Sequence, residues 1–156
     1  KECIDPTNDN LDDCFNAGPS HLSATLSDIN LTAFDNIRFE WNQCTSGGLF
    51  KIHIWEDNEG IPGAELFSEL LLIDFYEGWN NAVISTMGIE NTSSVWVGIR
   101  EYTATQAIGI DIDNQGCSVV NYGNGWEELS EGTLAYRLTS CLDDSPAGCF
   151  ANGCHA

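Results

Sequence analysis

LFKIHIWEDNEGIPG, residues 49–63, alternates between apolar and polar side chains and then runs into turn-forming residues. Phe50, Ile52 and Ile54 share one face of an extended chain, while the residues between them share the other. This alternation predicts a strand with one buried face and places His53 on the solvated face. Because Asn, Gly and Pro follow closely, the strand should end near residue 56 beside an antiparallel neighbour.

The same period of two recurs along the chain. Ile37, Phe39 and Trp41 alternate with charged residues, and a turn at 44–48 should join that strand to 50–55 as a hairpin. Further turns, one of them at 78–81, separate short apolar runs at 21–26, 66–73, 82–85, 95–99, 108–112, 118–122 and 134–138. About nine short strands without a long helix predict an all-β protein, a single antiparallel β-sandwich of the jelly-roll or Ig-like kind.

The sandwich should occupy residues 21–141 as one domain. Residues 1–20 are rich in Asp, Asn, Pro and Gly and form a Cys-bearing N-terminal arm. Residues 142–156 carry no strand pattern and form a Cys-bearing C-terminal tail.

The charge balance limits the classes of partner. The 156 residues include 24 acidic and 5 basic side chains, for a net charge of −19. Binding the phosphates of a nucleic acid needs clusters of Lys and Arg, so a nucleic acid partner is excluded. No apolar run approaches the roughly 20 residues that a membrane-spanning helix needs, so no membrane insertion is expected.

Seven cysteines in so short a chain indicate an oxidising compartment, and we expect a secreted, extracellular protein whose signal peptide has been removed. Cys3 could close the arm onto Cys14, and Cys117 and Cys141 are plausible mates. The odd count leaves at least one thiol unpaired within a monomer, which favours a bond to another subunit. The candidate disulfide cysteines are Cys3, Cys14, Cys117, Cys141, Cys149 and Cys154.

Several motifs between residues 34 and 139 carry a resemblance to a known family. They are WEDNEGIPGAELFSE (55–69), a GWN turn (78–80), SVWVGI (94–99), AIGIDIDNQG (107–116), YGNGWEEL (122–129) and GTLAYRL (132–138). In this order they resemble secreted bacterial β-sandwich modules appended to exoenzymes and surface proteins. The resemblance implies a non-catalytic extracellular module. Such modules usually sit inside long chains, whereas this one carries cysteines at its ends, which favours assembly with other subunits.

The sharpest chemical motif is Cys149-Phe150-Ala151-Asn152-Gly153-Cys154-His155. It resembles a widened haem-attachment motif of c-type cytochromes, in which Cys149 and Cys154 would bond to haem c and His155 would bind the iron. The candidates for the sixth iron ligand are His21, His53 and Met87. A disulfide between the two cysteines explains the same residues.

A calcium site is a further alternative. Asp111 and Asp113 occupy the first and third positions of a segment that begins like an EF-hand loop. Tyr122 stands where the bidentate Glu belongs, so an EF-hand is excluded, and the simpler interpretation is an Asx turn.

The sequence predicts no enzyme, because no catalytic elbow, metalloprotease helix or phosphate loop is present. The leading hypothesis is a secreted structural or adhesive subunit that self-associates, or binds other surface proteins, through its ends into an assembly or filament. The first alternative is an extracellular monohaem electron-transfer protein. The second is a carbohydrate-binding module that stacks sugars on Trp55, Trp79 or Trp126, although packing is the commoner use of such residues.

Overall fold

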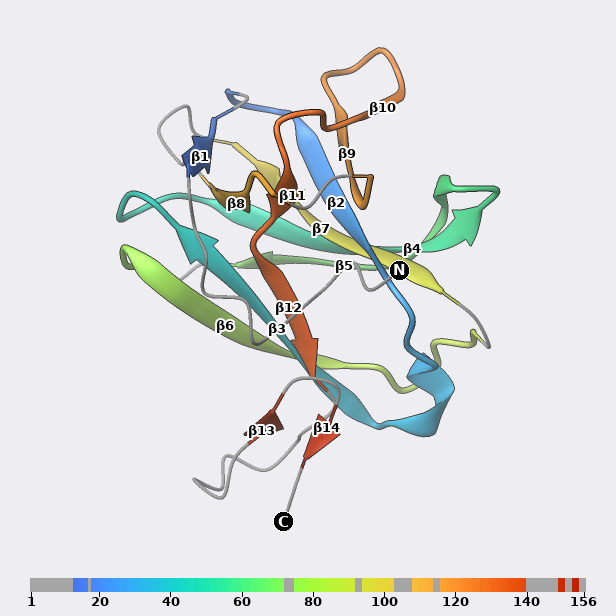
Figure 1. Ribbon diagram of the computed structural model, residues 1–156. Helices are drawn as coiled ribbons and strands as arrows, with labels where there is room; N and C mark the ends of the chain where they lie inside the picture. The colour runs from blue at the N-terminus through green and yellow to red at the C-terminus, as the bar shows by residue number, and fades with distance from the viewer. Residues whose placement is uncertain are drawn as a thin grey trace.

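The computed structural model describes residues 13–16, 18–71, 75–91, 94–102, 108–113 and 116–139, and the backbone of 149–150 and 153–154. Two antiparallel sheets pack face to face, as Figure 1 shows. The described part of the chain has one short 3₁₀ helix, η1 (Leu31–Ala33), and no α-helix. The predicted all-β sandwich is confirmed.

The first sheet is built around β3, which pairs with β6 on one side and β12 on the other. At the end of β3, Gln43 pairs with Ile108 of β8, and β8 in turn pairs with β1 and β11. The strands of this sheet are β1 (Asp13–Phe15), β3 (Asn36–Gln43), β6 (Gly78–Ser85), β8 (Ile108–Asp111), β11 (Thr133–Leu134) and β12 (Tyr136–Thr139).

The second sheet has the order β10-β9-β2-β7-β4-β5, so β5 forms one of its edges. Its strands are β2 (Leu22–Ser27), β4 (Phe50–Asn58), β5 (Ile61–Leu71), β7 (Val95–Glu101), β9 (Ser118–Asn121) and β10 (Trp126–Glu128). Its central strand β7 contains Gly98, and a Cβ there would lie 1.9 Å from the carbonyl oxygen of Ser23 on β2. Glycine is therefore needed for the close approach of these two strands.

The main core lies between the sheets. It contains the alternating apolar residues of β3 and β4 that the sequence pattern identified, together with residues from most other strands. Phe39 stacks on Trp41, and Trp41 meets the ring edges of Phe50 and Phe75. Aromatic contacts of this kind stabilise a core beyond the area they bury.

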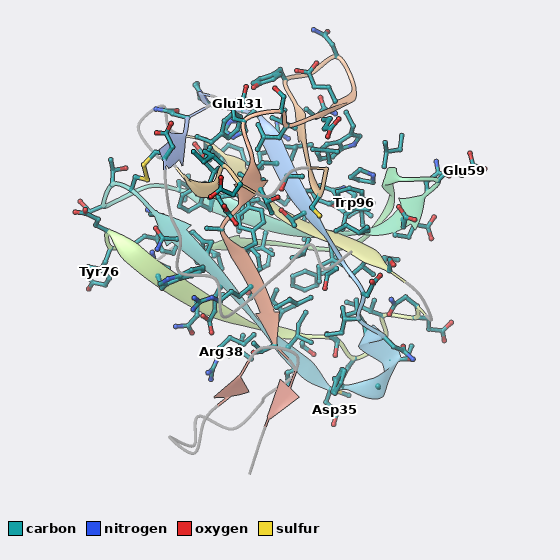
Figure 2. All side chains as sticks on the ribbon, in the orientation of Figure 1. Asp35, Arg38, Glu59, Tyr76, Trp96 and Glu131 are labelled. Carbon is teal, nitrogen blue, oxygen red and sulfur yellow. A yellow bond between two sulfur atoms is a disulfide. The ribbon has the colours of Figure 1, made fainter. Side chains whose placement is uncertain are left out.

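The β4–β5 hairpin is longer and tighter than expected. β4 continues to Asn58 and β5 begins at Ile61, so the loop contains only Glu59 and Gly60. Both loop residues have positive φ, 52° and 92°, which is the conformation of a type I′ turn. Figure 2 shows Glu59 at the tip of this hairpin.

Three expectations about local structure are wrong. The turn at 44–48 does not make a hairpin, because β3 and β4 belong to different sheets. The residues expected to turn at 78–81 are the start of β6, which pairs along the whole of β3. Two-residue strands also occur outside the expected sandwich, at β13 (Cys149–Phe150) and β14 (Gly153–Cys154) in the tail, and β1 lies in the arm.

The expected ring between Cys3 and Cys14 is replaced by a longer link. Cys14 forms a disulfide with Cys44, 30 residues away, and this bond ties β1 to the loop after β3. Cys117 is buried and also disulfide-bonded, as expected, but its partner lies outside the described residues. Cys3 and Cys141 lie outside the described residues as well.

Candidate functional site

Several aromatic side chains on the outward face of the second sheet pack against one another and are buried. His53 and Trp55 are each 6% exposed, which contradicts the solvated position expected for His53. The two rings stack with their centroids 5.0 Å apart, and Trp126 meets Trp55 edge-on at 5.2 Å. Trp96 joins this second cluster and donates its indole N–H to Asp57 at 2.8 Å. The cluster is therefore a small satellite core on the outer side of the sheet.

This packing occupies the tryptophans that were candidates for sugar stacking. Trp55 and Trp126 contact each other inside the satellite core. On the first sheet, the guanidinium of Arg137 lies 3.6 Å from the ring centroid of Trp79. The ring face under Arg137 is therefore covered by a cation.

His53 also has a specific acidic partner. Its Nδ1 lies 2.5 Å from a carboxylate oxygen of Glu65 on β5. Burial lowers the pKa of His53 below its ordinary value, and the Glu65 carboxylate opposes that shift only in part. The nearby positive charges of Lys51 and Arg100 also lower the pKa of His53, each by less than the Glu65 carboxylate raises it.

A second titratable pair, His21 and Glu101, lies at the end of the sandwich where β7 finishes and β2 begins. Both side chains are almost completely buried, and His21 Nε2 is 3.6 Å from Glu101 Oε1. Neither carboxylate oxygen has a hydrogen-bond partner among the described residues. Burial raises the pKa of Glu101 to about 8 and lowers the pKa of His21.

The contacts of His21 determine which of its ring nitrogens carries the hydrogen. His21 Nδ1 is hydrogen-bonded to the carbonyl oxygen of Gly18, so Nδ1 carries the hydrogen and donates it. The lone pair of Nε2 then faces the carboxyl of Glu101, which is protonated at neutral pH. Phe15 and Tyr122 pack around the imidazole, at 6.1 and 6.4 Å between ring centroids. The result is a neutral, enclosed acid–imidazole pair.

A pocket of about 270 Å³ opens on the outer face of the second sheet. Its walls are Leu49, Lys51, Leu70 and Tyr102. The backbone N–H of Tyr102 donates to the carbonyl oxygen of Leu49 at 3.2 Å, which holds the ends of β7 and β4 together. Leu70 and Tyr102 are 44% and 37% exposed, so the pocket presents apolar surface to solvent.

Two cations stand beside this pocket. Lys51 on β4 and Arg100 on β7 are directly opposite each other in the strand register. The guanidinium of Arg100 lies 5.4 Å from the ring centroid of Tyr102. Neither cation makes an ion pair with a carboxylate of the described residues, and Arg100 Nε is buried without a hydrogen-bond partner there. Sequence reasoning missed this site, because Lys51 and Arg100 are far apart in the chain.

The predicted haem residues are brought together only in part. Cys149 on β13 and Cys154 on β14 are paired Cα partners across a short antiparallel hairpin. Their side chains and the whole of His155 lie outside the described residues. Of the candidates for a sixth ligand, His21 and His53 are buried and Met87 is 75% exposed. The haem hypothesis stays a prediction.

The predicted calcium residues form a turn. Asp111, at the end of β8, accepts a hydrogen bond from the backbone N–H of Asp113 at 3.0 Å, which is the contact of an Asx turn. In the part of the chain that the structure describes, no three His, Cys, Asp or Glu residues cluster in a way that could hold a metal ion. A calcium site therefore also stays a prediction.

Comparisons with known proteins identify the fold. No family model matches the sequence, and no curated protein matches it. A solved structure of the clostridial cysteine protease Cwp84 after propeptide cleavage aligns with a TM-score of 0.56 and 16% identity over 81% of this chain. A structure of the cysteine protease and lectin-like domains of Cwp84, a surface-layer-associated protein of Clostridium difficile, aligns with 0.55 and 15% over 79%.

The FlgD structure from P. aeruginosa aligns with a TM-score of 0.36, which is too low for an argument. The chain spans about a third of the length of the Cwp84 chains, 36% and 32%. At these identities the likeness concerns the fold alone. Within the described residues, no helix is long and apolar enough to cross a membrane.

Proposed function

We propose that this chain is a non-catalytic module of an extracellular bacterial surface, a structural or adhesive subunit that binds rather than turns over its partner. One contrast carries the proposal. The acid–base groups His21 and Glu101 are sealed inside the sandwich, whereas the pocket that opens to solvent offers apolar walls and two cations. An apolar pocket with a few fixed charges is suited to recognising a partner.

The fold supports placement at a surface. Its matches include chains of Cwp84, which is described as surface-layer associated and as having a lectin-like domain. The seven cysteines add support for a secreted subunit that links to others, because seven thiols cannot all pair within one monomer.

Assembly is tested on the full chain purified under oxidising conditions. Non-reducing electrophoresis should show species larger than the monomer that collapse on reduction, and negative-stain microscopy should show the corresponding multimers. A sample treated with an alkylating agent after reduction is the matched control. A strictly monomeric protein under both conditions would contradict the assembly role.

The haem hypothesis has a separate observation in its favour, the hairpin that pairs Cys149 with Cys154. A disulfide between the two cysteines uses the same hairpin and is our preferred interpretation. A visible absorption spectrum distinguishes the two: a Soret band with sharp reduced α and β bands would establish haem c, and a colourless protein eliminates it.

A carbohydrate-binding role has less support, because Trp55 and Trp126 are used in packing and one face of Trp79 is covered by Arg137. We expect a glycan array to stay blank. Binding to a neutral sugar on the array would revive this alternative.

A further inference from the structure

We propose that the pocket formed by Leu49, Lys51, Leu70 and Tyr102, together with Arg100 beside it, is a binding site for an acidic peptide segment of a partner chain. The segment would place an apolar side chain in the pocket and a neighbouring carboxylate between Lys51 and Arg100. The inference names the partner of the proposed binding module, and it rests on that function only in requiring a binding role.

The charges of this site select an anion. The chain has only five basic side chains against 24 acidic ones, yet two of the five face each other across β4 and β7. Like charges directly opposite on neighbouring strands are destabilising, and here no described carboxylate relieves the repulsion. Among the described residues, the buried Nε of Arg100 has no hydrogen-bond partner, which leaves a donor unsatisfied. A bound carboxylate would offset both costs.

Neither Glu65 nor Glu69, the described acidic residues of β5, forms an ion pair with Lys51 or Arg100. Glu65 on β5 is engaged by His53, at 2.5 Å from Nδ1. Glu69 pairs with Ile52, whereas Leu70 pairs with Lys51, so Glu69 and Leu70 lie on opposite faces of the strand. Among the described residues that line the pocket or contact its wall, the charged side chains are Lys51 and Arg100.

The walls of the pocket favour a peptide over an acidic sugar. They consist of two leucines, a tyrosine ring and the stem of a lysine, with almost no polar surface. A sugar ring in such a pocket would leave its hydroxyl groups without partners, which costs free energy, whereas an aliphatic side chain gains by burial. Leu70 also lies on β5, whose outer edge pairs with no described strand. An extended peptide can hydrogen-bond along such an edge.

The test uses a fluorescein-labelled synthetic peptide that contains Leu-Asp-Asp, a triplet that this chain itself carries at residues 11–13 and 142–144. Fluorescence anisotropy measures its affinity for the full chain at low salt. We expect saturable binding that weakens about tenfold or more in Lys51→Gln and in Arg100→Gln, and that weakens as salt is raised. A Leu-Asn-Asn peptide tests the need for charge, and a Gly-Asp-Asp peptide tests the need for the apolar side chain; both should bind at least about tenfold more weakly.

Arg38→Gln is the matched control. It removes the same charge from β3 of the other sheet, and Figure 2 shows Arg38 away from the β4–β5 hairpin. This variant should bind the peptide as the unmodified chain does. Circular dichroism of all variants checks that each is folded.

Absence of peptide binding would overturn the inference. Equal losses of peptide affinity in Arg38→Gln and Lys51→Gln would also overturn it, because they would indicate an effect of net charge alone. Binding of an oligogalacturonate, with a dependence on Lys51 that the peptide lacks, would assign the site to acidic glycans and also overturn it. A monomeric protein that binds the peptide would contradict the assembly role and confirm this inference, so the two failures are distinguishable.

Discussion

Replacing Glu101 by Gln should remove most of the loss of stability that we expect at alkaline pH. The carboxyl is fully buried, and burial raises its pKa from 4.5 to about 8 in the folded protein. Between these pH values the unfolded chain has released the proton while the folded chain still holds it. The folded state therefore loses stability as pH rises, at about 1.4 kcal/mol per pH unit. Below pH 4.5 the contribution is fully present, and above about pH 8 it is lost.

The magnitude follows from the width of that window. From pH 4.5 to 8 the loss amounts to roughly 4 to 5 kcal/mol, and about 3 kcal/mol of it falls between pH 5.5 and 8.5. Gln is nearly isosteric with the protonated acid and cannot ionise. Relative to the unmodified chain, Glu101→Gln should therefore gain about 3 kcal/mol more at pH 8.5 than at pH 5.5.

Urea unfolding followed by tryptophan fluorescence measures this difference at the two pH values. Because the result is a difference between two proteins, the titration of His21 and of other groups cancels to the extent that the substitution leaves them unchanged. Glu56→Gln, at an exposed position on β4, is the matched control and should change stability by less than about 0.5 kcal/mol at either pH. A gain for Glu101→Gln that is equal at pH 5.5 and 8.5 would refute the protonated buried carboxyl.

Three further outcomes follow from the packing, the disulfide and the second buried histidine. Gly98→Ala should destabilise the protein by more than about 3 kcal/mol, because the added Cβ would lie 1.9 Å from the Ser23 carbonyl oxygen. A melting temperature close to that of the unmodified chain would contradict the close approach of the two strands. Replacing Cys14 and Cys44 together by Ser should cost roughly 3 to 4 kcal/mol in urea unfolding, as expected for opening a 30-residue loop, and peptide mapping without reduction should recover the linked peptides. Burial lowers the pKa of His53, so the midpoint of its NMR titration should lie below 6.5. Protonation of His53 should therefore reduce the stability of the fold as pH falls through 6.5. A midpoint above 6.5 would show that the Glu65 carboxylate has the larger effect on this pKa.

The sequence pattern predicted the inner faces of the sandwich well. Ile37, Phe39 and Trp41 on β3 and the alternating residues of β4 are buried in the core, because a period of two assigns every second side chain to one face. The same pattern gave a wrong answer for His53, since alternation tells which residues share a face and not what covers it. Trp126, more than 70 residues later in the chain, supplies that cover through Trp55.

Strand pairing was less predictable than strand location. The loop at 44–48 has turn residues suited to a hairpin, yet it crosses from one sheet to the other. The partner of β3 on one side is β6, whose first residues look like a turn in the sequence. Local composition indicates whether a segment turns or extends, but it does not indicate which distant strand it will pair with.

The link between Cys14 and Cys44 shows the same limit. Cysteine count indicated disulfides, but the partner of Cys14 was fixed by where β1 and the end of β3 meet in space, and not by distance along the chain. Proximity in sequence favoured Cys3 because short loops close easily. In the folded protein, the pairing of β1 with β8 places Cys14 near the far end of β3 instead.

The candidate site at Lys51 and Arg100 has its origin in this same pairing of distant strands. Each residue alone is an ordinary outward-facing cation on a half-buried strand. The β4–β7 register sets them opposite each other and places Tyr102, just after β7, against Leu49, just before β4. A shift of either strand by one residue would turn the cation of that strand toward the core. The core face of β7 is apolar, so burial of residues such as Val97 and Ile99 fixes the register of the strand. This register in turn places two positive charges beside an open apolar pocket on an otherwise acidic protein.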